Sequence, residues 1–174
     1  GSDDDTVRIA RAAGVRVELQ REKGYAAALK EGVALAKGQW IITLDVDGSH
    51  PPALISALWA KRDAAECAVA SRFVPGGSSE APPLRRMLSK VLSMVYPRFL
   101  ALPVRDVSSG YRLYRRDVIA DLPLVSRNFA VLLEILIHLV AAGRRVCEVP
   151  LVYRVRESGS SKARIWRFGL SYLH

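Results

Sequence analysis

Short apolar runs alternate along the chain with longer segments in which apolar residues recur every three or four positions. The short runs are rich in β-branched residues and predict strands, whereas the longer segments predict helices. The predicted strands are Val15–Leu19, Trp40–Leu44, Cys67–Ser71, Tyr111–Tyr114 and Arg145–Tyr153. The predicted helices cover residues 6–13, 24–36, 51–62, 84–100 and 129–142. This alternation predicts an α/β fold with a Rossmann-like, mainly parallel sheet flanked by helices.

The length and composition fit one domain. The chain has 174 residues, half of them hydrophobic, which is enough for a sizeable core. We therefore expect residues 1–174 to form a single domain. A sheet of this type normally begins with a strand, but this chain opens on the acidic stretch Asp3-Asp4-Asp5 and a helix. We expect that the first strand of the sheet is missing and precedes Gly1.

The two cysteines do not indicate a disulfide framework. Cys67 and Cys147 both lie in apolar runs, which predicts buried free thiols and favours a reducing compartment.

Basic residues exceed acidic ones, 26 against 17, and the net charge is +9. Such an excess favours a polyanionic partner: nucleic acid, nucleotide phosphates or an anionic membrane surface. No run reaches the roughly 18 apolar residues that a membrane span needs. The most apolar one, residues 129–143, is interrupted by Glu134 and His138.

The predicted helix over residues 84–100 mixes large apolar side chains with four basic ones, Arg85, Arg86, Lys90 and Arg98. Two interpretations stay open. The helix lies in a membrane interface, where each basic residue gains about 1 kcal/mol near anionic lipid, or its apolar face packs on the sheet. Different parts of the helix can satisfy both.

Two carboxylates, Asp45 and Asp47, directly follow the predicted strand 40–44. In an open α/β sheet, ligands bind at the carboxyl ends of the strands. Hard divalent cations prefer oxygen ligands and are often shared with substrate phosphates. The pair therefore suits Mg²⁺ or Mn²⁺ bridging a nucleotide diphosphate, with Ser49 or His50 as a further ligand or hydrogen-bonding group. The alternative is that Asp47-Gly48-Ser49 is only a turn before the next helix.

Two further polar segments and two single basic residues are candidates for a functional site. The stretch 105–114 places Asp106, serines and a glycine between apolar flanks, and residues 148–162 end in a basic, hydroxyl-rich loop. The loop suits phosphate binding. Taken alone, the first is better explained as a capped turn with solvated charges, and the alternative for the second is an ordinary basic tail. Lys23 and Arg72, taken singly, are ordinary surface residues.

In combination, these segments resemble the family-2 glycosyltransferases of the GT-A fold, in particular the dolichol-phosphate mannose synthase and polyprenyl-phosphate glycosyltransferase group. The resemblance covers nearly the whole chain. Glu134 also matches the glutamate of a late helix in that family. Ser49 stands where some members have glutamine. The matching motifs are Gly1-Ser2-Asp3-Asp4-Asp5-Thr6, Lys23-Gly24 with Ala27-Ala28, Asp45-Val46-Asp47-Gly48-Ser49-His50-Pro51-Pro52, Ser71-Arg72-Phe73-Val74-Pro75-Gly76-Gly77, Asp106-Val107-Ser108-Ser109-Gly110-Tyr111-Arg112-Leu113-Tyr114, Glu148-Val149-Pro150, and Arg156 through Ser161-Lys162.

The resemblance implies transfer of a hexose, mannose before glucose, from GDP-mannose or UDP-glucose to a polyprenyl or dolichyl phosphate, with inversion at the sugar carbon. It implies peripheral attachment at the cytoplasmic face of a membrane. The expected cofactor is Mg²⁺ or Mn²⁺. Nucleic acid is not an expected partner, and the oligomeric state is open.

The resemblance also implies roles for individual residues. The expected catalytic residues are Asp47, Asp106 and Arg72; the donor-binding residues are Lys23, Asp45, Asp47, Arg72 and Lys162; the metal ligands are Asp45, Asp47 and Ser49; and the acceptor-phosphate residues are Arg85, Ser89 and Arg156. Arg85 and Ser89 are four residues apart, on one helix face. Asp106 is expected to position the acceptor or the sugar, because an acceptor phosphate with a second pKa of about 6 needs no strong base.

Three rivals remain. A glycosyltransferase with a soluble or protein acceptor is favoured if the helix 84–100 faces the core entirely. A basic nucleic-acid-binding module is opposed by the small number of aromatic residues and by basic residues that lie beside carboxylates. A catalytically inactive scaffold is the third, because the first strand is expected to be missing.

Overall fold

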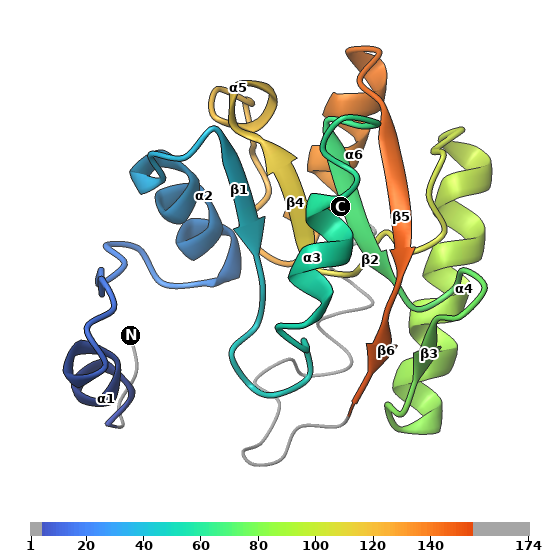
Figure 1. Cartoon of the computed structure of the whole chain (residues 1–174). Coiled ribbons are helices and arrows are strands. Elements are labelled where there is room, and N and C mark those ends of the chain that lie inside the picture. The colour runs from blue at the N-terminus through green and yellow to red at the C-terminus, as the bar shows by residue number, and fades with distance from the viewer. Residues whose placement is uncertain (1–4, 155–174) are drawn as a thin grey trace.

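The computed structural model describes residues 5–154, apart from the side chain of Arg85. The predicted loop 156–162, with the candidate site residues Arg156 and Lys162, lies outside the described residues. A four-stranded mixed sheet forms the centre of the fold, in the order β1-β4-β2-β5 (Figure 1). Its strands are β1 (Trp40–Thr43), β2 (Cys67–Ser71), β4 (Arg112–Arg115) and β5 (Val146–Pro150).

Helices cover both faces of this sheet, with α3 in front of it and α6 behind it in Figure 1. Each predicted helix is present, although α3 is shorter than expected and the short α5 was not expected. The helices are α1 (Thr6–Ala12), α2 (Tyr25–Leu35), α3 (Leu54–Trp59), α4 (Pro83–Phe99), α5 (Arg116–Ile119) and α6 (Val131–Ala141). The α/β fold class is confirmed.

The sheet is less parallel than the sequence pattern predicts. β2 and β5 pair in parallel, whereas β4 lies between β1 and β2 and pairs antiparallel with both. β1, β2 and β5 therefore run in one direction and β4 runs against them. An antiparallel insertion leaves no trace in hydrophobic periodicity, because a strand that is buried on both faces has the same composition in either direction.

The last predicted strand, residues 145–153, divides into β5 and β6 (Val152–Tyr153). β6 leaves the main sheet and pairs in parallel with β3 (Ser78–Ser79), in a segment predicted as a loop. Leu151 marks the division: its N–H donates to the Ser71 carbonyl at the end of β2, and its own carbonyl accepts from Ser78. This crossing brings the segment 72–79 next to the end of β5.

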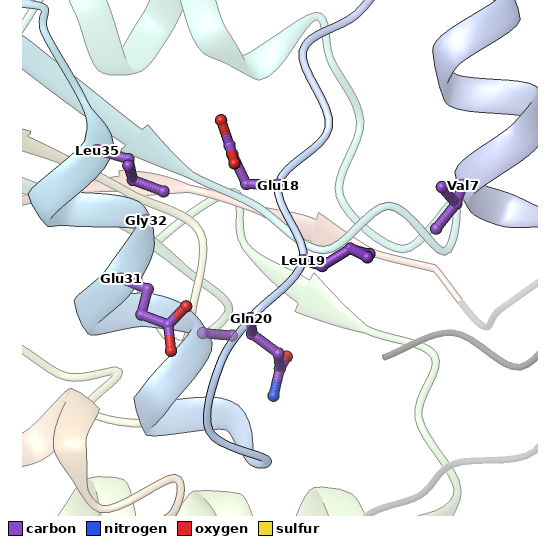
Figure 2. Close-up of a pocket in the computed structure, with 8 residues that line it drawn as sticks. Val7, Glu18, Leu19, Gln20, Glu31, Gly32 and Leu35 are labelled. Carbon is purple, nitrogen blue, oxygen red and sulfur yellow. The ribbon is translucent and has the colours of Figure 1, made fainter.

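The predicted strand Val15–Leu19 is wrong. Residues 15–20 form no strand, and Val15 and Leu19 are more than half exposed. This segment runs beside α2 and bounds a shallow hollow with α1, to which Val7, Leu19 and Leu35 contribute (Figure 2). Alternation alone does not make a strand, because its backbone groups need a partner strand. Of the predicted site residues that the structure describes, none lines this hollow.

Side-chain alternation divides the core between the two faces of the sheet. Cys67 and Val69 of β2 point to the face that α2 and α6 cover, and Ala68 and Ala70 point to the face that α3 covers. Cys67 and Cys147 belong to opposite faces and are both free, as the sequence predicts, but only Cys67 is buried and Cys147 is half-buried. Burial raises the pKa of the Cys67 thiol to about 12, so it is a packing residue.

Helix α4 lies at the side of the sheet, next to β5 and β3 (Figure 1). Its inner face packs Leu92 and Tyr96 against the core and buries Ser89 and Ser93. Its outer face carries large exposed apolar side chains, which we call the apolar stripe: Leu84, Met87, Val91, Met94, Val95 and Phe99. The packing interpretation is therefore confirmed for the inner face of α4, and the membrane interpretation stays a prediction for its exposed outer face. Between residues 5 and 154, no helix is long and apolar enough to cross a membrane.

Helix α6 supplies a test of the core. Leu136 is fully buried, whereas its neighbour Ile137 is 38% exposed. Leu136→Ala should lower the free energy of unfolding by about 2–5 kcal/mol, because it leaves a cavity. Ile137→Ala, the matched control, should cost no more than about 1 kcal/mol. Urea denaturation measures both, and equal losses would contradict this placement of α6.

Candidate functional site

The two carboxylates Asp45 and Asp47 lie just beyond the end of β1, as the sequence predicts. Buried His50 closes this turn: its Nδ1 accepts the Asp45 N–H at 2.8 Å, and its ring stacks on Tyr111 with centroids 4.9 Å apart. Tyr111 in turn donates its hydroxyl proton to the Pro51 carbonyl. The turn that carries the carboxylates is therefore anchored to the chain just before β4.

Ser49 is fully buried and faces Asp47. Its N–H and its hydroxyl both donate to Asp47 Oδ1. Gly48 takes a positive φ of 80°, a backbone conformation that glycine adopts without strain, and this closes the turn. In this geometry Ser49 orients Asp47, and its predicted role as a direct metal ligand stays untested.

Arg72 and Asp106 form a buried ion pair. The Arg72 Nε lies 2.7 Å from Asp106 Oδ2 and its Nη2 lies 2.8 Å from Asp106 Oδ1, which is the two-pronged geometry typical of strong arginine–carboxylate pairs. The Arg72 side chain is 11% exposed and the Asp106 side chain is fully buried. The Asp106 carboxylate therefore contacts Arg72 and is shielded from the solvent.

Backbone groups complete the surroundings of Asp106. The N–H groups of Arg72 and Ser109 donate to its carboxylate, and its own N–H donates to Glu148 Oε1 at 2.9 Å. Burial penalises the charged form, but the Arg72 guanidinium and these hydrogen bonds outweigh it and hold the pKa of Asp106 below its usual range. The carboxylate is ionised and fully engaged, which suits a group that fixes Arg72 in place.

A second arginine, Arg112, fixes the turn around Asp106 from inside the core. Its guanidinium is fully buried and donates to the carbonyls of Val107, Ser109 and Leu132 at 2.7–2.8 Å. Two of these carbonyls belong to the turn that follows Asp106, and the third belongs to α6. Arg112 therefore couples the position of this turn to the position of the helix.

Asp45, Arg72 and Ser89 line one hollow, which we call the carboxylate hollow. Asp45 and Arg72 follow β1 and β2, and Ser89 belongs to α4. The sequence predicts donor binding for Asp45 and Arg72 and acceptor-phosphate binding for Ser89. Its other lining residues are Tyr25, His50, Ser108, Ser109, Gly110, Phe129, Leu132, Leu151 and Tyr153.

Arg72 also borders a larger depression between the segment after β2 and helix α4, which we call the basic groove. It has a volume of about 620 Å³. Its lining combines four basic residues with apolar ones and, among the described residues, no carboxylate. The lining residues are Arg72, Phe73, Val74, Gly77, Lys90, Ser93, Met94, Pro97, Arg98 and Arg105. The Ser93 hydroxyl is buried and has no hydrogen-bond partner among the described residues.

The remaining predicted site residues are more scattered. Lys23 is exposed on the segment before α2 and lines neither the carboxylate hollow nor the basic groove. Arg85 belongs to the first turns of α4. Tyr25, Ser108 and Phe129 line the carboxylate hollow but were not predicted from the sequence. Tyr25 directly follows Lys23-Gly24 and Ser108 lies within the Asp106 motif, so motif proximity was the available indication for these two.

The donor set at the end of β1 matches what Mg²⁺ or Mn²⁺ takes from a protein when substrate phosphates supply the other oxygens, namely one or two carboxylates. Within residues 5–154, no group of three or more His, Cys, Asp or Glu side chains is placed to hold a metal ion without such help. The residue types of Asp45 and Asp47 therefore match an ion that binds together with a nucleotide diphosphate.

A family model and individual relatives among known proteins indicate the same family for this chain. The family model described as glycosyl transferase family 2 matches residues 1–122. The polyprenol monophosphomannose synthase of Mycolicibacterium smegmatis is 35% identical over 127 residues, which is 70% of this chain and 48% of that protein. The dolichol-phosphate mannosyltransferase of Pyrococcus furiosus is 34% identical over 154 residues, 85% of this chain and 43% of that protein. The chain spans about half the length of these relatives.

Among solved structures, the glucosyl-3-phosphoglycerate synthase of Mycobacterium tuberculosis in complex with Mn²⁺ and UDP-glucose resembles this chain with a TM-score of 0.74. The match is 18% identical and covers 99% of this chain and 62% of that one. This likeness shows a shared GT-A fold.

The buried pair gives a pH-dependent prediction. Asp106→Asn should lower the free energy of unfolding at pH 7 by about 3 kcal/mol, because Arg72 loses its charged partner. The pKa of Asp106 is depressed in the folded protein, so its contribution is complete above the usual value near 3.8 and is lost as the pH falls through the lower folded value. The difference between variant and unaltered protein should therefore shrink in acid.

Urea denaturation across this pH range measures the effect. Asp117→Asn is the matched control, because Asp117 pairs with Arg115 at the surface and its side chain is 65% exposed. It should cost less than about 1 kcal/mol. A loss at Asp106 that matched the control would contradict the buried pair.

Proposed function

This chain belongs to glycosyl transferase family 2, and we propose that it is the catalytic core of an enzyme that transfers a hexose from a nucleotide sugar to a polyprenyl or dolichyl phosphate at a membrane surface. One observation carries the proposal. Arg72 borders both the carboxylate hollow and the basic groove. A fixed guanidinium at this junction lies where a sugar would pass from a donor on one side to a phosphate acceptor on the other.

The donor occupies the side of the β1 carboxylates. Its leaving group is a nucleoside diphosphate, which gains negative charge as the glycosidic bond breaks. Asp45 and Asp47 would hold a Mg²⁺ or Mn²⁺ ion there, and the ion would neutralise that charge. Ser49 keeps Asp47 in one orientation for this task. The predicted donor contacts of Lys23 and Lys162 remain part of the proposal.

The acceptor occupies the basic side. A phosphate monoester is largely a dianion near neutral pH, because its second pKa is about 6. It attacks without a strong base, and inversion at the sugar carbon follows from a single in-line displacement. Buried Ser89 lines the carboxylate hollow beside Arg72, and Ser93, one helical turn further along α4, lines the basic groove. Arg85 and Arg156 stay predicted acceptor residues on the strength of the sequence.

Asp106 acts through Arg72 in this scheme. Its carboxylate is fully buried and engaged by the guanidinium and by backbone N–H groups. We therefore assign it the positioning role that the sequence analysis expected first, and the general-base role second.

A lipid acceptor explains the exposed apolar stripe on α4 better than a soluble one. A helix that faced the core entirely would have favoured a soluble or protein acceptor, but the stripe is exposed, with Phe99 at 84%. Large apolar side chains flanked by exposed Lys90 and Arg98 suit an interface with anionic lipid. We infer peripheral attachment through this face, on the cytoplasmic side.

The relatives' names favour mannose as the sugar, because both similar proteins named above are mannose-transferring enzymes by name. Glucose is the second choice, since the solved structure that shares this fold holds UDP-glucose. The donor is then GDP-mannose first and UDP-glucose second.

The function is tested by incubating the full-length protein with a panel of nucleotide sugars, a polyprenyl phosphate and Mg²⁺ or Mn²⁺, and identifying the lipid product by mass spectrometry. Asp47→Ala should remove at least about 99% of the transfer, because the charge on the leaving group then lacks its carboxylate-held counterion. Its metal-dependent nucleotide binding should disappear as well.

The matched control is Asp63→Ala, because the Asp63 side chain is 83% exposed and lines neither the carboxylate hollow nor the basic groove. It should keep full activity. Normal turnover by Asp47→Ala, or transfer to a soluble acceptor with none to the lipid, would refute the proposal.

The membrane contact of α4 is tested by flotation with liposomes that contain anionic lipid. Lys90→Glu should weaken binding roughly tenfold or more, because each basic residue near anionic lipid contributes about 1 kcal/mol and the variant also adds a negative charge. Lys61→Glu makes the same charge change at an exposed position away from α4 and should have little effect. Equal losses would point to net charge and away from α4.

A further inference from the structure

We propose that Tyr25 and Phe129 form an aromatic wall on which the transferred sugar ring packs, so that this pair distinguishes the nucleotide sugar from the nucleotide alone. The inference rests on the proposed function, because it assigns a contact to the sugar of that reaction. No family motif quoted for this chain gives either residue a role.

The two rings lie in segments that are far apart in the sequence and face one another in the fold. Tyr25 is the first residue of α2, and Phe129 lies just before α6. Their centroids are 4.4 Å apart with an angle of 26° between the planes, so the two rings stack face to face. Both rings line the carboxylate hollow with Asp45 and Arg72.

The Phe129 side of the wall is held by several fixed contacts. Glu134 of α6 accepts the N–H groups of Val125 and Ser126 at 2.6 and 3.0 Å, and Lys30 of α2 donates to the Leu124 carbonyl at 2.6 Å. Burial opposes ionisation of Glu134, but the two backbone N–H groups outweigh it and lower the pKa of this carboxyl. The segment before Phe129 is therefore clamped between α2 and α6.

The Tyr25 side is set against the strand that carries the carboxylates. A Cβ atom added at Gly110 would lie 2.7 Å from the Tyr25 hydroxyl oxygen, so the ring reaches the backbone there. The Gly110 carbonyl accepts the hydroxyl proton of Thr43, in β1, at 2.7 Å. The Tyr25 side of the wall is thus held against the end of β1, two residues before Asp45.

Of the parts of the donor, the sugar ring is the one that remains to contact the aromatic wall. The diphosphate belongs to the β1 carboxylates and the attacking phosphate belongs to Arg72 and Ser89, so the sugar ring must lie between them. Two stacked rings line that same hollow. A hexose has a face of C–H groups that packs on an aromatic surface, and the contact also keeps water from the reacting carbon. A nucleoside diphosphate without its sugar does not reach this surface.

Calorimetry with four ligands tests the wall: GDP-mannose and UDP-glucose, each beside its free nucleoside diphosphate, with Mg²⁺ or Mn²⁺ present. Tyr25→Leu and Phe129→Leu should weaken binding of the nucleotide sugar that the unaltered protein prefers by roughly tenfold. Binding of the matching diphosphate should change less than about twofold. Tyr25→Phe and Phe129→Tyr keep the rings and should retain the preference.

Glu134→Gln supplies a variant that keeps both rings. It replaces one acceptor oxygen by an N–H₂ group, which faces the N–H groups of Val125 or Ser126 and releases the segment that holds Phe129. The same sugar-specific loss is expected, with the melting temperature lowered by about 2–8 °C because the folded state loses a charged hydrogen-bond acceptor.

Equal loss of sugar and diphosphate binding in the leucine variants would overturn the wall, since it would indicate a nucleotide contact or a structural defect. Unchanged binding of both ligands would overturn it as well. If the unaltered protein bound neither diphosphate nor nucleotide sugar, the proposed function itself would fail, and the wall with it. The three results are therefore distinguishable.

Discussion

The buried pair of Arg72 with Asp106 determines how the rest of the candidate site is arranged. A charge removed from water is tolerated only when a partner and further hydrogen bonds replace the solvent. Here protein groups replace the solvent: the backbone N–H groups of Arg72 and Ser109 donate to the Asp106 carboxylate, and Glu148 in β5 accepts the Asp106 N–H. The pair therefore ties β2, β5 and the turn before β4 into one unit.

Arg112 extends this unit into the core. It has backbone carbonyls as partners on the turn after Asp106 and on α6, so a shift of that helix would move the turn. α6 also carries Glu134, which clamps the segment before Phe129. One helix is thus connected to both sides of the carboxylate hollow, through Arg112 to the Arg72 side and through Glu134 to the aromatic side. Its inward-facing side chains are buried in the core, which restricts the movement of the helix.

The sequence predicts those parts of the molecule that depend on local pattern. β2 has the predicted bounds because its five residues are all buried, and Asp45 and Asp47 follow β1 as expected. Contacts between segments that are far apart in the sequence are not determined by the local pattern. Val15–Leu19 alternates correctly but has no partner strand, and the direction of β4 is fixed only by its neighbours. Arg72 with Asp106, 34 residues apart, and Tyr25 with Phe129 meet only in the fold.

The reversed direction of β4 has a consequence for where chemistry is encoded along the chain. Strands β1 and β2 deliver their polar residues after they end, because their carboxyl ends lie at the edge with the hollow. β4 runs the other way, so it brings to that edge the residues that precede it. This explains why the Asp106 turn stands before its strand while Asp45 and Arg72 stand after theirs. A rule that searches only beyond strand ends would pass over one of the three segments that meet in this site.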